Sequence, residues 1–226
     1  MIRALAVRCA LLALPVTGCS GSPAPSWSPV AAPAAALVAD EGAGLKTAIF
    51  AGGCFWSVEA VFSQTRGVTD AVSGYHGGTQ RSARYDIVTS GMTDHVEAVR
   101  VTYDPAIVRY DQLLQLFFSV VADPTSGDRQ GPDRGPEYAA ALITSNGQQR
   151  LVAEQYLAQM DASGKWPAPI VTPVVTVRTF YPAEPVHQDF AARNPQHSYV
   201  QRWTKPKVEA LQRLYPGLYS PASPHG

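Results

Sequence analysis

The sequence predicts an α+β fold, a two-layer sandwich in which helices cover one face of a mixed sheet. Apolar and polar residues alternate over 96–103, where Glu97, Val99, Val101 and Tyr103 share one face of a strand. Over 110–121 the apolar residues recur at helical spacing. The expected elements follow the order β-α-β-β-α-β-α-β. This order fits a ferredoxin-like β-α-β-β-α-β core with an added C-terminal coil and helix.

Each element is expected from a local pattern of apolar, glycine and proline residues. A short apolar strand at 47–51 leads through Gly52-Gly53 into an amphipathic helix that starts at Cys54. The final short helix is expected to be capped by Thr204, with Leu211 and Leu214 facing inward. The other expected elements are a strand at 67–73, a glycine-rich loop at 74–78, a brief helix or irregular stretch at 85–90, a long polar loop at 123–137, a strand at 138–145, a helix at 148–160, an edge strand at 170–180 interrupted by Pro173, and a helical turn at 187–193.

Length and charge restrict the class of protein. The chain has 226 residues, which suits one domain with a sizeable core or at most two small ones. Eighteen basic and eighteen acidic residues give no net charge, so no nucleic-acid partner is expected.

The first residues have the features of a bacterial export signal. Residues 1–18 combine a basic start with a short apolar stretch that is too short to span a bilayer. They end at Val16-Thr17-Gly18-Cys19, which resembles a lipobox and predicts lipidation of Cys19. The alternative is a plain secretory signal with a chance cysteine. Ser20, and not Asp, follows Cys19, which in Gram-negative lipoproteins would suggest the outer membrane. We expect an exported, lipid-anchored protein of the cell envelope that faces the periplasm.

The remaining boundaries follow from composition. Residues 19–44 are rich in Ser, Pro, Ala and Gly without periodicity, which predicts a flexible linker. A single domain is expected over 45–219, followed by a loose tail at 220–226.

Cys54 is the one cysteine of the predicted domain, since Cys9 and Cys19 lie in the leader. This excludes a disulfide within the domain and a zinc site built from clustered cysteines. A Gly-Gly turn can place the thiol tightly at a helix start, where the helix dipole favours the nucleophilic thiolate. The alternative for Cys54 is a buried structural thiol.

Five stretches, in order between Lys46 and Tyr199, together resemble the peptide methionine sulfoxide reductase A family. They are Gly53-Cys54-Phe55-Trp56 with Glu59, Gly74-Tyr75-His76-Gly77-Gly78, Asp94-His95-Val96-Glu97, Asp123-Pro124-Thr125 with Asp128 to Tyr138, and Ala183-Glu184 with His187-Gln188-Asp189. Departures from the family pattern occur at Asp94, Val96, Pro132, Glu137, Ala139, Val186 and Phe190.

The resemblance implies reduction of methionine S-sulfoxide, free or in a polypeptide, for the repair of oxidised proteins. Cys54 would attack the sulfoxide sulfur while negative charge develops on the oxygen, so proton donors are required there. The resemblance assigns that task to Glu97, Tyr75 and Tyr138. A carboxyl group beside apolar surface has a raised pKa and can stay protonated to donate.

The resemblance also implies a substrate pocket. Phe55 and Trp56 would hold the methyl group of the substrate, since aromatic contacts with a methyl on sulfur are favourable. Asp133 and His187 would help to bind the substrate. As plain core residues, the aromatic pair would look the same in sequence.

No cysteine follows Cys54, so the chain looks like a one-cysteine member of the family. Attack would leave Cys54 as a sulfenic acid, which an external thiol must reduce, either a thioredoxin-like protein or a small thiol such as dithiothreitol. No bound cofactor or metal is expected, and we expect a monomer that touches a membrane only through its lipid.

Two other functions remain open from the residues. In a cysteine hydrolase, His76, His95 or His187 would act as the base for Cys54. In a non-catalytic envelope lipoprotein, the aromatic pocket would bind a ligand.

Overall fold

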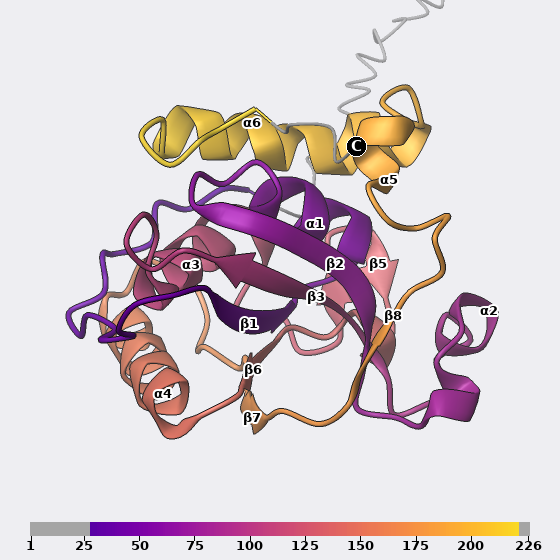
Figure 1. Cartoon of the computed structure of the whole chain (residues 1–226), viewed down its shortest axis with the longest axis horizontal. Coiled ribbons are helices and arrows are strands. Elements are labelled where there is room, and N and C mark those ends of the chain that lie inside the picture. The colour runs from indigo at the N-terminus through magenta and orange to yellow at the C-terminus, as the bar shows by residue number, and fades with distance from the viewer. Residues whose placement is uncertain (1–27, 222–226) are drawn as a thin grey trace, which may run out of the picture.

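The computed structural model describes residues 28–221, and six strands form its main sheet in the order β7-β6-β1-β3-β2-β8 (Figure 1). A separate two-stranded ribbon pairs β4 with β5. The strands are β1 (Lys46–Ala51), β2 (Val68–His76), β3 (Val96–Tyr103), β4 (Arg129–Gln130), β5 (Asp133–Arg134), β6 (Ala141–Thr144), β7 (Val174–Thr176) and β8 (Phe180–Pro182). The helices are α1 (Phe55–Phe62), α2 (Tyr85–Val88), α3 (Tyr110–Leu116), α4 (Gly147–Ala162), α5 (Phe190–Arg193) and α6 (Lys205–Leu214), with short 3-10 helices η1 (Gln80–Ser82) and η3 (Pro136–Tyr138) and π-helices η2 (Phe117–Val121) and η4 (Val200–Thr204).

The centre of the sheet confirms the predicted fold class. The strands β6, β1, β3 and β2 lie side by side, and each neighbouring pair is antiparallel. With α1 after β1 and α3 after β3, this is the β-α-β-β-α-β core. The two remaining strands, β7 and β8, extend it at opposite edges, and the parallel pairing of β7 with β6 makes the sheet mixed.

One face of the sheet carries the main core, packed against α1 and α3. Phe50 on β1 stacks on Phe62 of α1 at 4.8 Å between ring centroids and lies 5.3 Å from the ring of Phe117. The turn between β1 and α1 passes so close to this cluster that a Cβ on Gly52 would lie 2.6 Å from Phe117. Helix α6 lies along α1 on the side away from the sheet (Figure 1). The start of α1 is therefore held between the sheet and α6.

The opposite face is covered by the segment that was predicted as a single strand at 170–180. This prediction was wrong, because the segment forms two short strands at opposite edges of the sheet. The segment packs Val175 of β7, Val177 of the connection and Phe180 of β8 onto a small apolar cluster that includes Ile49 and Ile143. A continuous strand would have stayed at one edge and left this cluster exposed.

Two local expectations also differ from the structure. Gly74 to His76, predicted as loop, continue β2, because they pair with β3 on one side and with β8 on the other. Thr204 makes no capping bond and is itself helical, while its hydroxyl lies 2.8 Å from that of Ser57. This contact joins the start of α6 to the first turn of α1.

Residues 28–44 belong to the stretch predicted as a flexible linker, but the structure seats them on α3 and α4. Ala32 and Ala39 are buried, the amide of Ala32 donates to Ser119, and the hydroxyl of Tyr156 donates to Pro33. Glu41 accepts bonds from the hydroxyl of Tyr103 and the amide of Tyr110. Small side chains and prolines in this stretch fit close to the helices, which a count of linker-type residues does not reveal.

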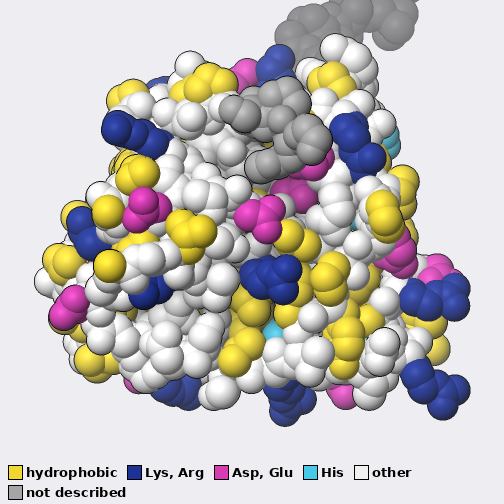
Figure 2. Space-filling model, viewed as in Figure 1, with side chains coloured by type: hydrophobic (Ala, Val, Ile, Leu, Met, Phe, Trp, Pro, Cys, Tyr) yellow, Lys and Arg dark blue, Asp and Glu magenta, His cyan; other side chains and the backbone are white. Residues whose placement is uncertain are grey.

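The surface agrees with the balanced charge of the chain. Figure 2 shows basic and acidic side chains scattered over one face without a continuous patch of either sign. Within residues 28–221, no helix is both long and apolar enough to span a bilayer. The predicted signal at 1–18, Cys19 and most of the tail at 220–226 lie outside the described residues.

Candidate active site

Cys54 stands at the N-cap of α1, immediately after the Gly-Gly turn, with 9% of its surface exposed. Gly53 adopts φ +85°, a conformation that favours glycine, and a Cβ there would lie 2.6 Å from Gln130. The side chain of Gln130 is itself fixed by two bonds to the backbone of Asp123. The thiol is thus held rigidly, as the sequence predicted.

The electrostatics at the thiol differ from the expectation. Burial raises the pKa of Cys54, and the nearby carboxyl groups of Glu97 and Asp133 raise it further. Hydrogen bonds with the backbone of Trp56 and the hydroxyl of Tyr199 act in the opposite direction. The resting group is therefore a neutral thiol, since desolvation outweighs the helix N-terminus.

Glu97 reaches the same place from β3. Its carboxyl group accepts a bond from the amide of Phe55 at 2.9 Å, one residue beyond Cys54. Burial raises the pKa of Glu97 to about 8, with added contributions from Asp133 and Glu137. A protonated carboxylic acid therefore lies beside the thiol at neutral pH.

The tyrosines at the site are partly those that the sequence suggested. Burial is the main cause that raises the pKa of Tyr138, and the nearby charges of Glu97 and Cys54 raise it further. The same causes, with burial again the largest, raise the pKa of Tyr85 to about 12. The hydroxyl of Tyr75, by contrast, donates to Glu184 at 2.8 Å. Tyr85 thus occupies the position expected of Tyr75.

Sequence reasoning missed Tyr85 for a definable reason. It follows a polar stretch with no apolar periodicity, and its position depends on the contact between its amide and Glu184, 99 residues away. The glycine-rich motif at 74–78 pointed instead to Tyr75 as the donor. The ring of Tyr75 lies 5.8 Å from that of Phe55. Tyr75 therefore supports the pocket wall while its hydroxyl is engaged elsewhere.

An aromatic wall surrounds the start of α1. The ring of Phe55 is fully buried and lies 5.5 Å from that of His187. Trp56 donates through its indole nitrogen to Nδ1 of His187 at 3.3 Å and stacks on Phe190 at 3.7 Å. His187 also stacks on Tyr85 at 4.2 Å. The structure brings both predicted pocket residues and His187 together.

Asp133 lies on β5 beside a second residue that sequence reasoning did not assign, Tyr199. The hydroxyl of Tyr199 donates to Asp133 at 2.6 Å and also interacts with the thiol of Cys54. Burial raises the pKa of Asp133, against the effect of this bond. Tyr199 lies in a short helical stretch directly before η4, and it belongs to none of the five matched stretches, so only the path of the chain in space reveals its role.

The other two predicted bases for a cysteine hydrolase are engaged elsewhere. Nε2 of His76 accepts a bond from the amide of Arg178 at 2.8 Å. Nδ1 of His95 accepts from the amide of Gly78, and its Nε2 lies 2.9 Å from the carbonyl oxygen of Thr79. Nδ1 of His187 accepts a hydrogen bond from the indole nitrogen of Trp56. The geometry therefore favours carboxyl and phenol donors over a Cys–His pair.

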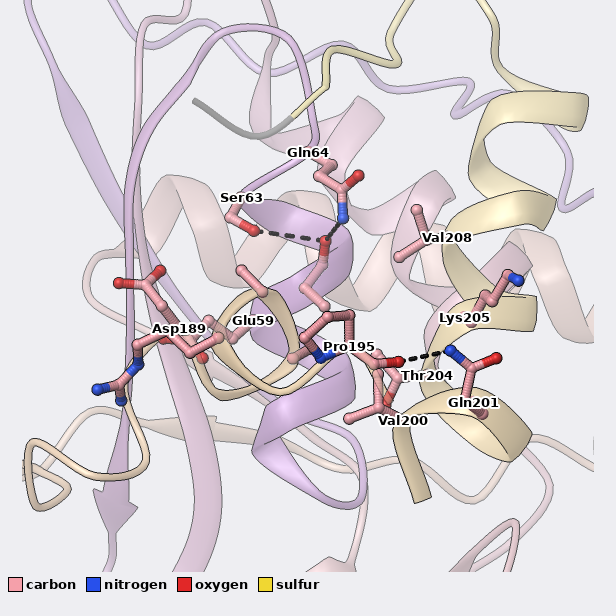
Figure 3. A pocket seen from close by; sticks show the side chains of 14 residues that line it. Glu59, Ser63, Gln64, Asp189, Pro195, Val200, Gln201, Thr204, Lys205 and Val208 are labelled. Atoms are coloured by element: carbon pink, nitrogen blue, oxygen red, sulfur yellow. Dashed lines mark hydrogen bonds between the residues drawn. The ribbon is translucent and has the colours of Figure 1, made fainter. Parts of the chain in front are cut away.

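A cavity of about 530 Å³ lies beside α1 but away from the thiol (Figure 3). It is enclosed by α1, α5, η4 and α6, and Figure 3 labels Glu59, Ser63, Gln64, Asp189, Pro195, Val200, Gln201, Thr204, Lys205 and Val208 around it. Cys54 and Glu97 do not line it, so we place the reactive site at the start of α1. Over the described residues, no cluster of three or more His, Cys, Asp or Glu side chains could hold a metal ion.

Comparison with known proteins agrees with this arrangement. Residues 46–216 match the family model described as peptide methionine sulfoxide reductase. The chain belongs to this family. A peptide methionine sulfoxide reductase MsrA 2 of Mesorhizobium japonicum is 49% identical over 177 residues, which are 78% of this chain and 91% of the relative.

Two solved structures from the family resemble the fold. Methionine sulfoxide reductase A of Corynebacterium diphtheriae is 32% identical with a TM-score of 0.57, over 67% of this chain and 76% of that chain. Reduced Mxr1 from Saccharomyces cerevisiae is 27% identical with a TM-score of 0.59, over 71% and 92% of the two chains.

Proposed function

We propose that this methionine sulfoxide reductase reduces methionine S-sulfoxide, free or within polypeptides, and so repairs oxidised proteins. The observation that carries the proposal is the meeting of one thiol with protonated donors. Cys54 lies beside the carboxyl group of Glu97. The hydroxyl groups of Tyr85 and Tyr138 interact electrostatically with both Cys54 and Glu97. This is the arrangement needed to transfer an oxygen atom from sulfur to sulfur.

The attack is a two-electron transfer. The thiolate of Cys54 attacks the sulfoxide sulfur, and the oxygen passes to Cys54 as it gains a proton. The products are methionine and the sulfenic acid of Cys54, which carries the oxygen as S–OH. Glu97 supplies the proton, since its raised pKa keeps it protonated at neutral pH. Tyr85 and Tyr138 donate hydrogen bonds to the developing oxyanion.

The aromatic wall selects the substrate. Phe55 and Trp56 receive the methyl group on sulfur, which leaves the oxygen directed at the proton donors for one epimer only. Asp133, held by Tyr199, and His187, held by Trp56, orient the remainder of the substrate.

Regeneration depends on a thiol from outside the chain. An external thiolate attacks the sulfenic sulfur, the hydroxyl leaves as water after gaining a proton, and a mixed disulfide forms. A second external thiol then takes the first as a disulfide and releases Cys54. A thioredoxin-like protein or a small dithiol fits this role, since no cysteine follows Cys54.

The test is an assay of S- and R-methionine sulfoxide with dithiothreitol as reductant. Wild type should reduce the S epimer, and Cys54→Ser should reduce neither. Equal turnover of both epimers by wild type, or turnover by Cys54→Ser, would contradict the proposal.

The proposed site of action is the bacterial cell envelope, with lipid on Cys19 as the anchor. This rests on the sequence of the leader alone, since Cys19 lies outside the described residues. Cys19→Ala should release the enzyme from membranes into the soluble fraction, while continued membrane association would refute the lipid anchor.

A further inference from the structure

Lys207 on α6 is a buried cation that the mechanism above does not use. Only 7% of its surface is exposed, and its ammonium group donates to the carbonyl oxygen of Val121 at 2.7 Å. Burying a charge is costly unless nearby groups compensate for it. The buried ammonium group of Lys207 should therefore lie near negative charge.

The packing places this ammonium group next to the turn that carries Cys54. Val121, its acceptor, is followed by Ala122, whose Cβ would lie 3.3 Å from a Cβ on Gly52, two residues before the thiol. The hydroxyl contact between Thr204 and Ser57 lies one turn before Lys207 on α6 and one turn after Cys54 on α1. Two independent contacts thus hold Lys207 and Cys54 in the same region.

The charges around this region are unequal. Glu97 on β3 and Asp133 on β5 both oppose the thiolate, while Tyr199, Tyr85 and Tyr138 contribute neutral hydroxyl groups. Burial lowers the pKa of Lys207 to about 8, and the charges of Asp133 and Cys54 act to raise it. Lys207 in turn favours the ionised form of Asp133. At neutral pH the lysine is mostly protonated and offsets the negative charge.

We propose that Lys207 is a positioning residue that stabilises the Cys54 thiolate through space. It contributes at two steps of the proposed function: when the thiolate attacks the sulfoxide, and when Cys54 leaves the mixed disulfide as a thiolate. The second step matters in a chain without a resolving cysteine, because a more stable thiolate leaves faster.

The test is the rate of alkylation of resting Cys54 by iodoacetamide between pH 6 and pH 10. Lys207→Met keeps most of the length of the side chain and removes its charge. It should slow alkylation at pH 7, where Lys207 is protonated, about tenfold, equivalent to about 1.4 kcal/mol. Lys207→Arg keeps the charge and should restore most of the rate. This measurement needs no sulfoxide, so its failure is distinct from failure of the proposed function.

Lys205→Met is the matched control. Lys205 lies on the same helix, more than half exposed, and pairs with Glu209 at 3.9 Å (Figure 3 shows its side chain beside the cavity). Its removal should change the alkylation rate by less than about twofold, since exposed charges are strongly screened. Urea unfolding of every variant separates a loss of charge from a loss of structure. Equal rates for Lys207→Met and wild type would overturn the proposal, as would an equal slowing by Lys207→Arg.

A second measurement uses the wild-type chain, should Lys207→Met fail to fold. Alkylation of Cys54 with iodoacetate leaves a negative group on sulfur, whereas iodoacetamide leaves a neutral group of similar size. NMR of ¹³C-labelled lysine should show Lys207 titrating at higher pH in the negatively charged adduct. The same titration midpoint in both adducts would overturn the proposal.

Discussion

Glu97→Gln is the substitution that separates proton donation from all other features of the site. Glutamine has nearly the same volume and keeps an oxygen that can accept the bond from the amide of Phe55, now 2.9 Å long. It cannot ionise or deliver an acidic proton. The start of α1 should therefore keep its geometry while the sulfoxide oxygen loses its donor.

The size of the effect follows from the pKa values. Glu97 has its pKa raised to about 8 by burial and then by Asp133 and Glu137, and the pKa of Cys54 lies above its usual range. In the reactive state Cys54 and Glu97 hold one proton between them, with Cys54 as thiolate and Glu97 protonated, and the two groups titrate together. The fraction of molecules in which this pair has lost one proton rises from roughly a tenth at pH 7 to roughly a half at pH 8. Wild-type kcat/KM should therefore rise about fivefold over this range.

The assay is kcat/KM for S-methionine sulfoxide with dithiothreitol between pH 6 and pH 10. Glu97→Gln should lower kcat/KM about 10²–10³-fold at pH 8 and remove the inflection near that pH. Glu59→Gln is the control, because Glu59 is an equally buried carboxyl group on α1 that lies away from the thiol, and it should keep wild-type activity. A Glu97→Gln enzyme within threefold of wild type, with the inflection preserved, would refute the role of Glu97.

Three further predictions concern stability. Burial raises the pKa of Glu59 from 4.5 to about 7, so the folded state holds more protons than the unfolded state between these pH values. The free energy of unfolding should therefore fall by about 3 kcal/mol as pH rises through that window. Urea unfolding of Glu59→Gln should show a smaller fall over the same window. Gly52→Ala places a Cβ 2.6 Å from Phe117 and should cost about 1–3 kcal/mol in urea unfolding, whereas Gly147→Ala, with nothing within 4 Å, should not destabilise the protein. Glu41→Ala removes the acceptor that holds residues 28–44 to β3 and α3, so hydrogen exchange in that stretch should become faster; unchanged exchange would show that its other contacts suffice.

The sequence predicted the core of the fold because that core depends on local patterns. The alternation over β3 and the apolar stripe of α3 are properties of neighbouring residues, and both elements appear where they were expected. The path of residues 170–182 depends on which edge of the sheet has free backbone groups, which no local pattern records. Residues 28–44 were misjudged for a similar reason, since their composition hides contacts with helices more than 70 residues away.

The candidate site divides in the same way. Cys54 and Glu97 were predictable, because a motif marks each and β3 orients the carboxyl group inward. Tyr85 and Tyr199 were not, since each lies in a short helical stretch outside the matched motifs and is held near the thiol by contacts with partners far away in the sequence. The protonation state of the thiol could not be predicted from the sequence either. Burial and two carboxyl groups raise the pKa of Cys54, and they outweigh the effect of the helix dipole that the motif suggested.

The most direct test of the account is the fate of Cys54 in a single turnover. The soluble domain is mixed with excess S-methionine sulfoxide in the absence of any reductant, and intact mass, peptide mass and methionine release are measured together. One methionine should be released per chain, and one added oxygen atom should be found on Cys54. An unmodified Cys54 after methionine release, or a disulfide between two chains in place of the added oxygen, would contradict it.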